Sequence, residues 1–315
     1  MTAAFESVGD GILAIDADYV RPRLAASHLL TAGRHAAFID VGTNRSALNL
    51  LAALASCQLA ADDVEHIILT HVHLDHAGGA GQLARLLPQA RVWVHPRGAA
   101  HLTDPAKLIA GTMALYGAKR YAELYGELEP IAKERISTVA DGQRLTLGDR
   151  TLEFIYTPGH ALHHVCIADR DARVVFTGDT FGISYREFDG AAGEFVLPTT
   201  TPTQFDPEQL SRSIDRVLEL QPRAAYLTHY SRVTSIERLG ADLKADIAAF
   251  VAIARETARS PERVARIEAA MFDYLSERLD RHGYRGDEHL RHQLLDGDIE
   301  LNAAGLDVWL SRTAP

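Results

Sequence analysis

A hexapeptide with four metal-binding side chains places the strongest constraint on the fold of this chain. Residues 71–76 read His-Val-His-Leu-Asp-His, directly after an apolar run at 67–70 whose pattern predicts a buried strand. Burying three imidazoles and a carboxylate without partners would cost several kcal/mol per group. A divalent metal ion would satisfy them all, because neutral imidazole and carboxylate oxygen are ligands of zinc and, to a lesser degree, of iron or manganese. The chain therefore needs a fold that gathers metal ligands at the end of a strand.

The spacing of the hexapeptide indicates two binding points. Residues i and i+2 of an extended segment point the same way, so His71 and His73 can approach one ion. Asp75 and His76 are adjacent and lie past the end of the strand, where a turn can direct both to a second point. Gly-Gly at 78–79 and a helical pattern follow, so the ligand loop should lead into a helix.

Three later apolar segments also end in potential ligands. His160 follows a segment at 152–156 and a Pro-Gly turn, Asp179 follows a segment at 174–177, and His229 follows one at 224–228. Strand ends of a layered sheet open into a common cleft, so these side chains should meet the hexapeptide. His163 and His164 are alternatives to His160, which the bend at the preceding glycine favours.

The order of these motifs resembles the metallo-β-lactamase-fold hydrolases, and within them the glyoxalase II and lactonase-like branch. The segment Phe-Ile-Asp-Val-Gly at 38–42 resembles the first motif of that family. The resemblance implies two divalent metal ions, with zinc as the first expectation and iron or manganese as alternatives. It also implies that Asp40 is buried and supports the ligand loop without binding metal itself. The implied ligands are His71, His73 and His160 for the first metal, Asp75, His76 and His229 for the second, and Asp179 as a bridge.

The same resemblance implies an α/β (α+β) fold, a four-layer αββα sandwich. Periodicity agrees, because strand and helix patterns alternate in blocks. The expected strands are 8–15, 27–30, 36–40, 67–70, 91–94, 152–156, 164–168, 173–177 and 224–228, and the expected helices are 45–57, 82–87 and 207–220.

Two segments extend this core. A helical insertion at about 104–130 is broken by Gly117 and Gly126; its tyrosines Tyr116, Tyr121 and Tyr125 either line the substrate site or pack on the core or on a second subunit. A catalytic domain at 1–235 should end before a helical extension at 236–315, with helices at 239–257, 261–279 and 289–295. Ser260 as N-cap and a proline at the first position should begin the middle one. The extension should cover the site, dimerise or pack as a separate layer.

Charge and composition exclude several partners. The net charge is −10 and no run of lysine or arginine stands out, which disfavours nucleic acid. The chain shows neither a signal-peptide pattern nor an apolar stretch of membrane-spanning length. The two cysteines do not form a disulfide framework, so we expect a cytoplasmic protein. The expected partners are a small-molecule substrate and, as an option, a second copy of the chain in a homodimer.

These features predict a metal-dependent hydrolase that cleaves a small ester, thioester, lactone or related bond. A hydroxide shared by the two metals would attack, while Asp75 and Asp179 anchor it and move its proton. Tyr185 or Tyr230 would donate a hydrogen bond to the oxyanion, or pack in the core. The alternatives are a mononuclear non-haem iron persulfide dioxygenase, a di-iron electron-transfer protein and a non-catalytic metal-binding protein.

Overall fold

A computed structural model describes residues 4–200 and 203–313, which form two compact units. The first unit contains residues 4–156, 163–178 and 222–232, and the second contains 157–162, 179–200, 203–221 and 233–313. The second unit therefore combines the C-terminal helices with two segments that come earlier in the chain. A separate domain at 236–315 stays a prediction.

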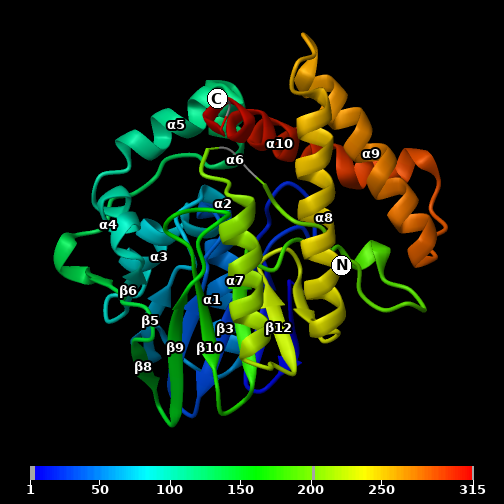
Figure 1. The fold of residues 1–315 in the computed structure, drawn as a ribbon. Helices are drawn as coiled ribbons and strands as arrows, with labels where there is room; N and C mark the ends of the chain where they lie inside the picture. Colours follow the sequence, from blue (N-terminus) through cyan, green and yellow to red (C-terminus); the bar gives the residue numbers. More distant parts are fainter. Residues whose placement is uncertain (1–3, 201–202, 314–315) are drawn as a thin grey trace. The chain divides into compact units, whose positions relative to one another are not determined.

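The first unit carries the two sheets of the fold (Figure 1). In the first sheet the strands follow the order of the chain: β1 (Phe5–Gly9), β2 (Ile12–Asp16), β3 (Ala26–Ala32), β4 (His35–Ile39), β5 (Val64–Ile68), β6 (Arg91–Val94) and β7 (Ile136–Thr138). The pairs from β1 to β4 are antiparallel and those from β4 to β7 are parallel. The parallel half therefore collects its strand C-termini at one edge, where the hexapeptide begins.

The second sheet has the order β13-β12-β11-β10-β9-β8. Its strands are β8 (Arg144–Leu147), β9 (Arg150–Tyr156), β10 (Val165–Asp169), β11 (Val174–Gly178), β12 (Ala224–Leu227) and β13 (Ser231–Val233). The pairs from β8 to β11 are antiparallel, and β11 pairs with β12 in parallel. Parallel β11 and β12 end on the same side, so the residues that follow them leave the sheet at one edge.

Two apolar cores hold the layers of the first unit together. Between the sheets, Ile39 and Ile68 of the first sheet pack with Phe154 and Phe176 of the second. On the other face of the first sheet, α1 (Ala47–Ser56) and α3 (Ala80–Leu86) pack against it, for example through Leu50. The helices expected at 45–57 and 82–87 are therefore confirmed as α1 and α3.

One expected strand was wrong in its extent. The segment at 8–15 is not continuous, because Asp10 and Gly11 both have positive φ and turn the chain between β1 and β2. Asp-Gly is a strong signal for a two-residue hairpin turn, and here the turn interrupts the apolar run. The first sheet therefore begins with a hairpin.

The insertion is helical, as predicted. It contains α5 (Ala106–Tyr116) and α6 (Ala118–Leu124), which follow α4 (Pro96–Thr103). Gly117, with φ of +77°, separates α5 from α6. No residue of α5 is fully buried, whereas α6 buries Tyr121 and Leu124, so α6 anchors the insertion to the first unit.

The second unit is helical and contains the C-terminal extension. Its helices are α7 (Pro207–Glu219), α8 (Ile236–Thr257), α9 (Arg263–His282) and α10 (Glu288–Thr313). Buried polar contacts join them: Asp246 of α8 accepts a hydrogen bond from the Tyr274 hydroxyl of α9 at 2.8 Å and pairs with Arg278. Within residues 4–200 and 203–313, no helix combines the length and the apolarity that crossing a membrane requires.

Two details of the extension differ from the prediction. The helix that Ser260 should cap begins instead at Arg263, and its N-cap residue Glu262 makes no side-chain capping bond. The final helix, expected only at 289–295, runs from Glu288 to Thr313. The helix includes glycines at 297 and 305, but buried side chains recur at helical spacing beyond them, as at Ile299 and Leu306. Packing here outweighs the low helix propensity of glycine.

Candidate metal centre

The hexapeptide lies where β5 gives way to a short helix. His71 follows β5, and His73 is the N-cap of α2 (Leu74–Ala77), so Asp75 and His76 fall inside that helix. The Nε2 atom of His71 lies 2.9 Å from the Nδ1 atom of His73. The alternation predicted for these two histidines therefore does bring a nitrogen of each to one point.

Asp75, His76 and His229 form a group of potential metal ligands within the first unit. One ligand atom from each lies within 4.8 Å of the others. The Oδ2 atom of Asp75 is 3.6 Å from Nε2 of His76 and 3.2 Å from Nε2 of His229. His229 comes two residues after β12, so the end of a distant strand supplies the third member, as expected.

The imidazoles of this group are held in place by their other nitrogen. Nδ1 of His76 donates to Oδ2 of Asp40 at 2.7 Å, and Nδ1 of His229 donates to the carbonyl oxygen of Leu24 at 2.9 Å. In a neutral imidazole this leaves the lone pair on Nε2. Both lone pairs thus face Asp75. Histidines that bind metals are commonly oriented in this way, so the donor set fits a divalent cation.

Asp40 connects several strand ends beneath the ligand loop. It is 1% exposed and accepts hydrogen bonds from the Thr70 backbone N–H at 2.8 Å and from the Thr228 hydroxyl at 2.8 Å, in addition to His76. Thr70 precedes His71 and Thr228 precedes His229. A single carboxylate therefore holds the residues that precede two of the predicted ligands, one through its backbone N–H and one through its hydroxyl.

His160 and Asp179 approach each other within the second unit. Nε2 of His160 lies 3.3 Å from Oδ2 of Asp179, while Nδ1 lies 3.4 Å from the carbonyl oxygen of Thr199. The turn before His160 needs glycine, because Gly159 has φ of +132° and a Cβ there would lie 2.1 Å from the backbone nitrogen of Leu210. In this pair, as at His76 and His229, Nε2 of the imidazole faces a carboxylate oxygen while Nδ1 faces another oxygen atom.

The sequence alternatives to His160 lie in the first unit beside His71. The ring centroid of His164 is 4.8 Å from that of His71, and that of His163 is 6.1 Å away. Both histidines are buried, and neither belongs to the Asp75, His76 and His229 group. Both histidines therefore lie beside His71, in the segment directly before β10.

The insertion packs against the ligand helix through its tyrosines. Tyr121 and Tyr125 are buried with Leu74, the residue between His73 and Asp75, and Tyr116 packs on the same cluster. The hydroxyls of Tyr125 and Tyr19 are 2.8 Å apart. Burial, assisted by the charge of Asp75, raises the pKa of Tyr19, so this hydroxyl stays protonated at neutral pH.

Tyr19 was missed by the sequence analysis, because it lies between β2 and β3 with no motif around it. Tyr116, Tyr121 and Tyr125, the predicted substrate residues, do gather beside Leu74. Their contact with a substrate stays a prediction.

The two tyrosines considered as oxyanion donors are both buried. In the second unit, the Tyr185 hydroxyl donates to Oδ2 of Asp298 at 2.7 Å, so it would have to leave that carboxylate to donate to a substrate. In the first unit, the guanidinium of Arg23 lies 5.0 Å from the ring centroid of Tyr230. Their catalytic roles stay predictions.

Comparison with known proteins identifies the family. The sequence model of the Metallo-beta-lactamase superfamily matches residues 20–229, more than half of the chain. The chain therefore belongs to this superfamily. Its branch within the superfamily stays a prediction.

Several relatives resemble part of the sequence. The metallo-beta-lactamase fold-containing protein ST1585 of Sulfurisphaera tokodaii is 30% identical over 212 residues, 66% of this chain and 73% of that protein. An atrochrysone carboxyl ACP thioesterase of Aspergillus fumigatus is 25% identical over 215 residues, 67% of this chain and 52% of that protein. The acyl-coenzyme A thioesterase MBLAC2 of Bos taurus is 27% identical over 190 residues, 56% of this chain and 65% of that protein. Family membership and these thioesterase names support a hydrolase.

Solved structures agree on the fold. The archaeal superfamily protein ST1585 from Sulfolobus tokodaii aligns with a TM-score of 0.65 and 24% identity, covering 95% of this chain and 98% of that one. The family protein TTHA1429 from Thermus thermophilus aligns with a TM-score of 0.65 and 22% identity, covering 86% of this chain and 95% of that one. These structures support the fold, including a helical C-terminal extension.

Proposed function

We propose that the chain is a metal-dependent hydrolase with a dinuclear centre, and that it cleaves a thioester or a related ester or lactone. Zinc is the expected metal, with iron or manganese as alternatives. The observation that carries the proposal is the pair of Nε2 atoms, on His76 and His229, that face one oxygen of Asp75 while both Nδ1 atoms are held from behind. Such an arrangement suits a divalent cation better than it suits an isolated carboxylate.

The remaining ligands of the proposal come from the other predicted positions. His71 and His73 would hold the first metal with His160, and Asp179 would bridge to the second. Connectivity supports this: His160 comes four residues after β9, and Asp179 directly follows β11, so both segments leave strands of the second sheet. The close approach of His160 and Asp179 to each other within the second unit is also what two ligands of one cluster require.

The chemistry divides between the metals and the protein. Two bound divalent metals would supply Lewis-acid polarisation of the carbonyl and a hydroxide at neutral pH. Asp75, whose Oδ2 lies beside two imidazoles, would orient the nucleophile, and Asp75 and Asp179 would accept its proton and return it to the leaving group. Asp40 would keep His76 in the tautomer that leaves Nε2 free to bind.

The insertion supports an acyl substrate with an apolar chain. The cluster around Leu74 includes the half-buried side chains of Leu108, Ile109 and Met113, which belong to α5. An apolar acyl group that covers them would gain about 25 cal/mol per Å² of apolar surface removed from water. Two of the relatives are named as thioesterases, which makes a thioester the first bond to test.

The test is hydrolysis of acyl thioesters of increasing chain length, with an aryl ester and a lactone in parallel, by zinc- or manganese-saturated protein. Thioester turnover should rise with chain length and disappear in His229→Ala. His35→Ala is the matched control, because His35 is exposed at the start of β4 and should keep full activity. Metal-saturated protein that hydrolyses none of the three bond types would refute the proposal. Oxygen uptake with a persulfide would favour the dioxygenase instead.

A further inference from the structure

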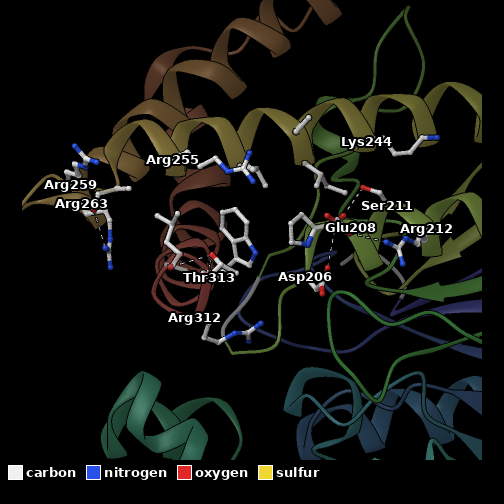
Figure 2. Close-up of a pocket in the computed structure, with 17 residues that line it drawn as sticks. Asp206, Glu208, Ser211, Arg212, Lys244, Arg255, Arg259, Arg263, Arg312 and Thr313 are labelled. Carbon is white, nitrogen blue, oxygen red and sulfur yellow. Dashed lines mark hydrogen bonds and ion pairs between the residues drawn. The ribbon is translucent and has the colours of Figure 1, made fainter. Parts of the chain in front are cut away.

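The second unit contains a groove that the proposed hydrolase chemistry does not use. Its volume is about 1170 Å³, and Figure 2 shows its walls, formed by α7, α8 and the end of α10. Along α8 the lining residues are Lys244, Ile247, Ala248, Val251 and Arg255, and the lining continues with Ala258 and Arg259 just after the helix ends. The α8 positions lie on one helical face, and at 1.5 Å per residue they extend over about 16 Å.

The groove is apolar in the middle and cationic at its ends. Ile247, Ala248 and Val251 form the apolar stretch on α8. Lys244 lies beyond one end of this stretch and Arg255 and Arg259 beyond the other, as Figure 2 shows. An elongated ligand with one charged end and one apolar part would match this pattern.

The cations at the Lys244 end are already neutralised. Nζ of Lys244 lies 2.6 Å from a carboxylate oxygen of Asp215, and Arg212 lies 3.0 Å from Glu208. Exposed pairs of this kind leave little net field for a ligand. The charged group of a ligand should therefore bind at the other end.

The arginines at the other end are differently placed. The guanidinium of Arg255 lies 5.6 Å from the ring centroid of Trp309, and that of Arg312 donates to the carbonyl oxygens of Thr203 and Phe205. Among the ion pairs of residues 4–200 and 203–313, Arg255, Arg259 and Arg312 have no carboxylate partner. Arg263 at this end is paired with Asp307. In a chain of net charge −10, such a cluster is a local reversal of charge.

We propose that this groove binds an elongated organic diphosphate. Arg255, Arg259 and Arg312 would hold the phosphates, and Ile247 and Val251 would contact the organic part. Guanidinium groups present planar donor pairs that match phosphate oxygens, and adjacent phosphates carry enough charge to occupy several of them. Cations near the ends of α8 and α10 also complement the helix dipoles, but one cation per helix would serve that purpose.

Trp309 provides a local signal for the test. The chain has two tryptophans, so Trp93→Phe leaves Trp309, in the groove, as the only one. Metal-saturated Trp93→Phe protein is titrated with pyrophosphate, ADP and geranyl diphosphate at constant ionic strength. Pyrophosphate should change the fluorescence saturably, and ADP or geranyl diphosphate should bind more tightly than pyrophosphate. The tighter of these two identifies the organic part as a nucleoside or an apolar chain.

Three variants in the same background locate the binding. Arg255→Gln/Arg259→Gln should weaken pyrophosphate binding by about tenfold or more. Arg266→Gln/Arg285→Gln removes the same charge from exposed positions outside the groove and should leave binding unchanged. His71→Ala should also leave it unchanged, because it perturbs only the metal centre.

Several results would overturn the proposal. Equal weakening in the two arginine double variants would mean that net charge alone attracts the anion. Loss of the signal in His71→Ala would place the diphosphate on the metals. Absence of saturable binding, or equal affinity for pyrophosphate and both organic diphosphates, would also refute it. Each variant is compared by circular dichroism and melting temperature, so a folding defect is recognised separately.

Discussion

Replacing Asp40 by asparagine tests whether the metal centre depends on a residue that does not bind metal in our assignment. The two side chains have nearly the same shape. Oδ2 of Asp40 accepts from Nδ1 of His76 at 2.7 Å and from the Thr228 hydroxyl at 2.8 Å, and Oδ1 accepts from the Thr70 N–H at 2.8 Å. An amide nitrogen accepts none of these bonds. Whichever way the asparagine turns, at least one buried donor loses its acceptor.

The magnitude follows from the bond to His76. A hydrogen bond to a charged group contributes about 1.5–3 kcal/mol. If the asparagine NH2 faces Nδ1, the imidazole must move its proton to Nε2, the atom that faces Asp75. At about 1.4 kcal/mol per tenfold change in affinity, the expected cost is a loss of about 10- to 100-fold in metal affinity, the range typical of residues behind a metal ligand.

The assay is competition for zinc against a chromophoric chelator, well below the melting temperature of each protein. Asp169→Asn is a matched control, because Asp169 is also 1% exposed, accepts from Arg150 at 2.8 Å and lies at the end of β10. Both variants should melt earlier than the wild type, and only Asp40→Asn should lose zinc affinity. Wild-type affinity in Asp40→Asn, or an equal loss in both variants, would refute the reasoning.

The metal-saturated protein should contain close to two metals per chain, and Asp179→Ala should lose metal and turnover but stay folded; elemental analysis that never exceeds one metal would contradict the dinuclear assignment. Burial lowers the pKa of His28 to about 4, so as the pH falls from about 6.5 the unfolded chain takes up a proton first. The free energy of unfolding should then fall toward pH 4 by up to about 1.4 kcal/mol per pH unit. Urea titrations at several pH values should show a weaker pH dependence in His28→Gln than in the wild type. An equal pH dependence in the two proteins would show that His28 titrates normally. Tyr116→Ala should lower kcat/KM for a long-chain thioester more than for a short one at unchanged metal content; equal losses would assign Tyr116 to packing.

The parts of the centre that sequence could predict are those in which a strand and its ligand are neighbours in the chain. One apolar run is followed directly by His71, His73, Asp75 and His76, and another is followed by His229. Each predicted strand therefore indicated where its potential ligands lie. The structure brings Asp75, His76 and His229 together as that pattern requires. Local periodicity carried this information.

Long-range contacts could not be predicted in this way. The bond between Tyr185 and Asp298 joins residues 113 positions apart, and Tyr19 meets Tyr125 over 106 positions. No local pattern in the sequence links the two residues of either pair. The length of α10 was also missed, because the burial of Leu306 decides it and burial depends on the other helices of the second unit.

The unequal burial of α5 and α6 has a consequence for how the protein can diversify. α6 covers Leu74 with Tyr121 and Leu124, so deleting the insertion would uncover the helix that carries Asp75 and His76. α5 fully buries none of its residues, and its side chains can be exchanged at small cost to stability. Homologues and engineered libraries should therefore change substrate range by replacing residues along α5, and should retain α6 with little variation.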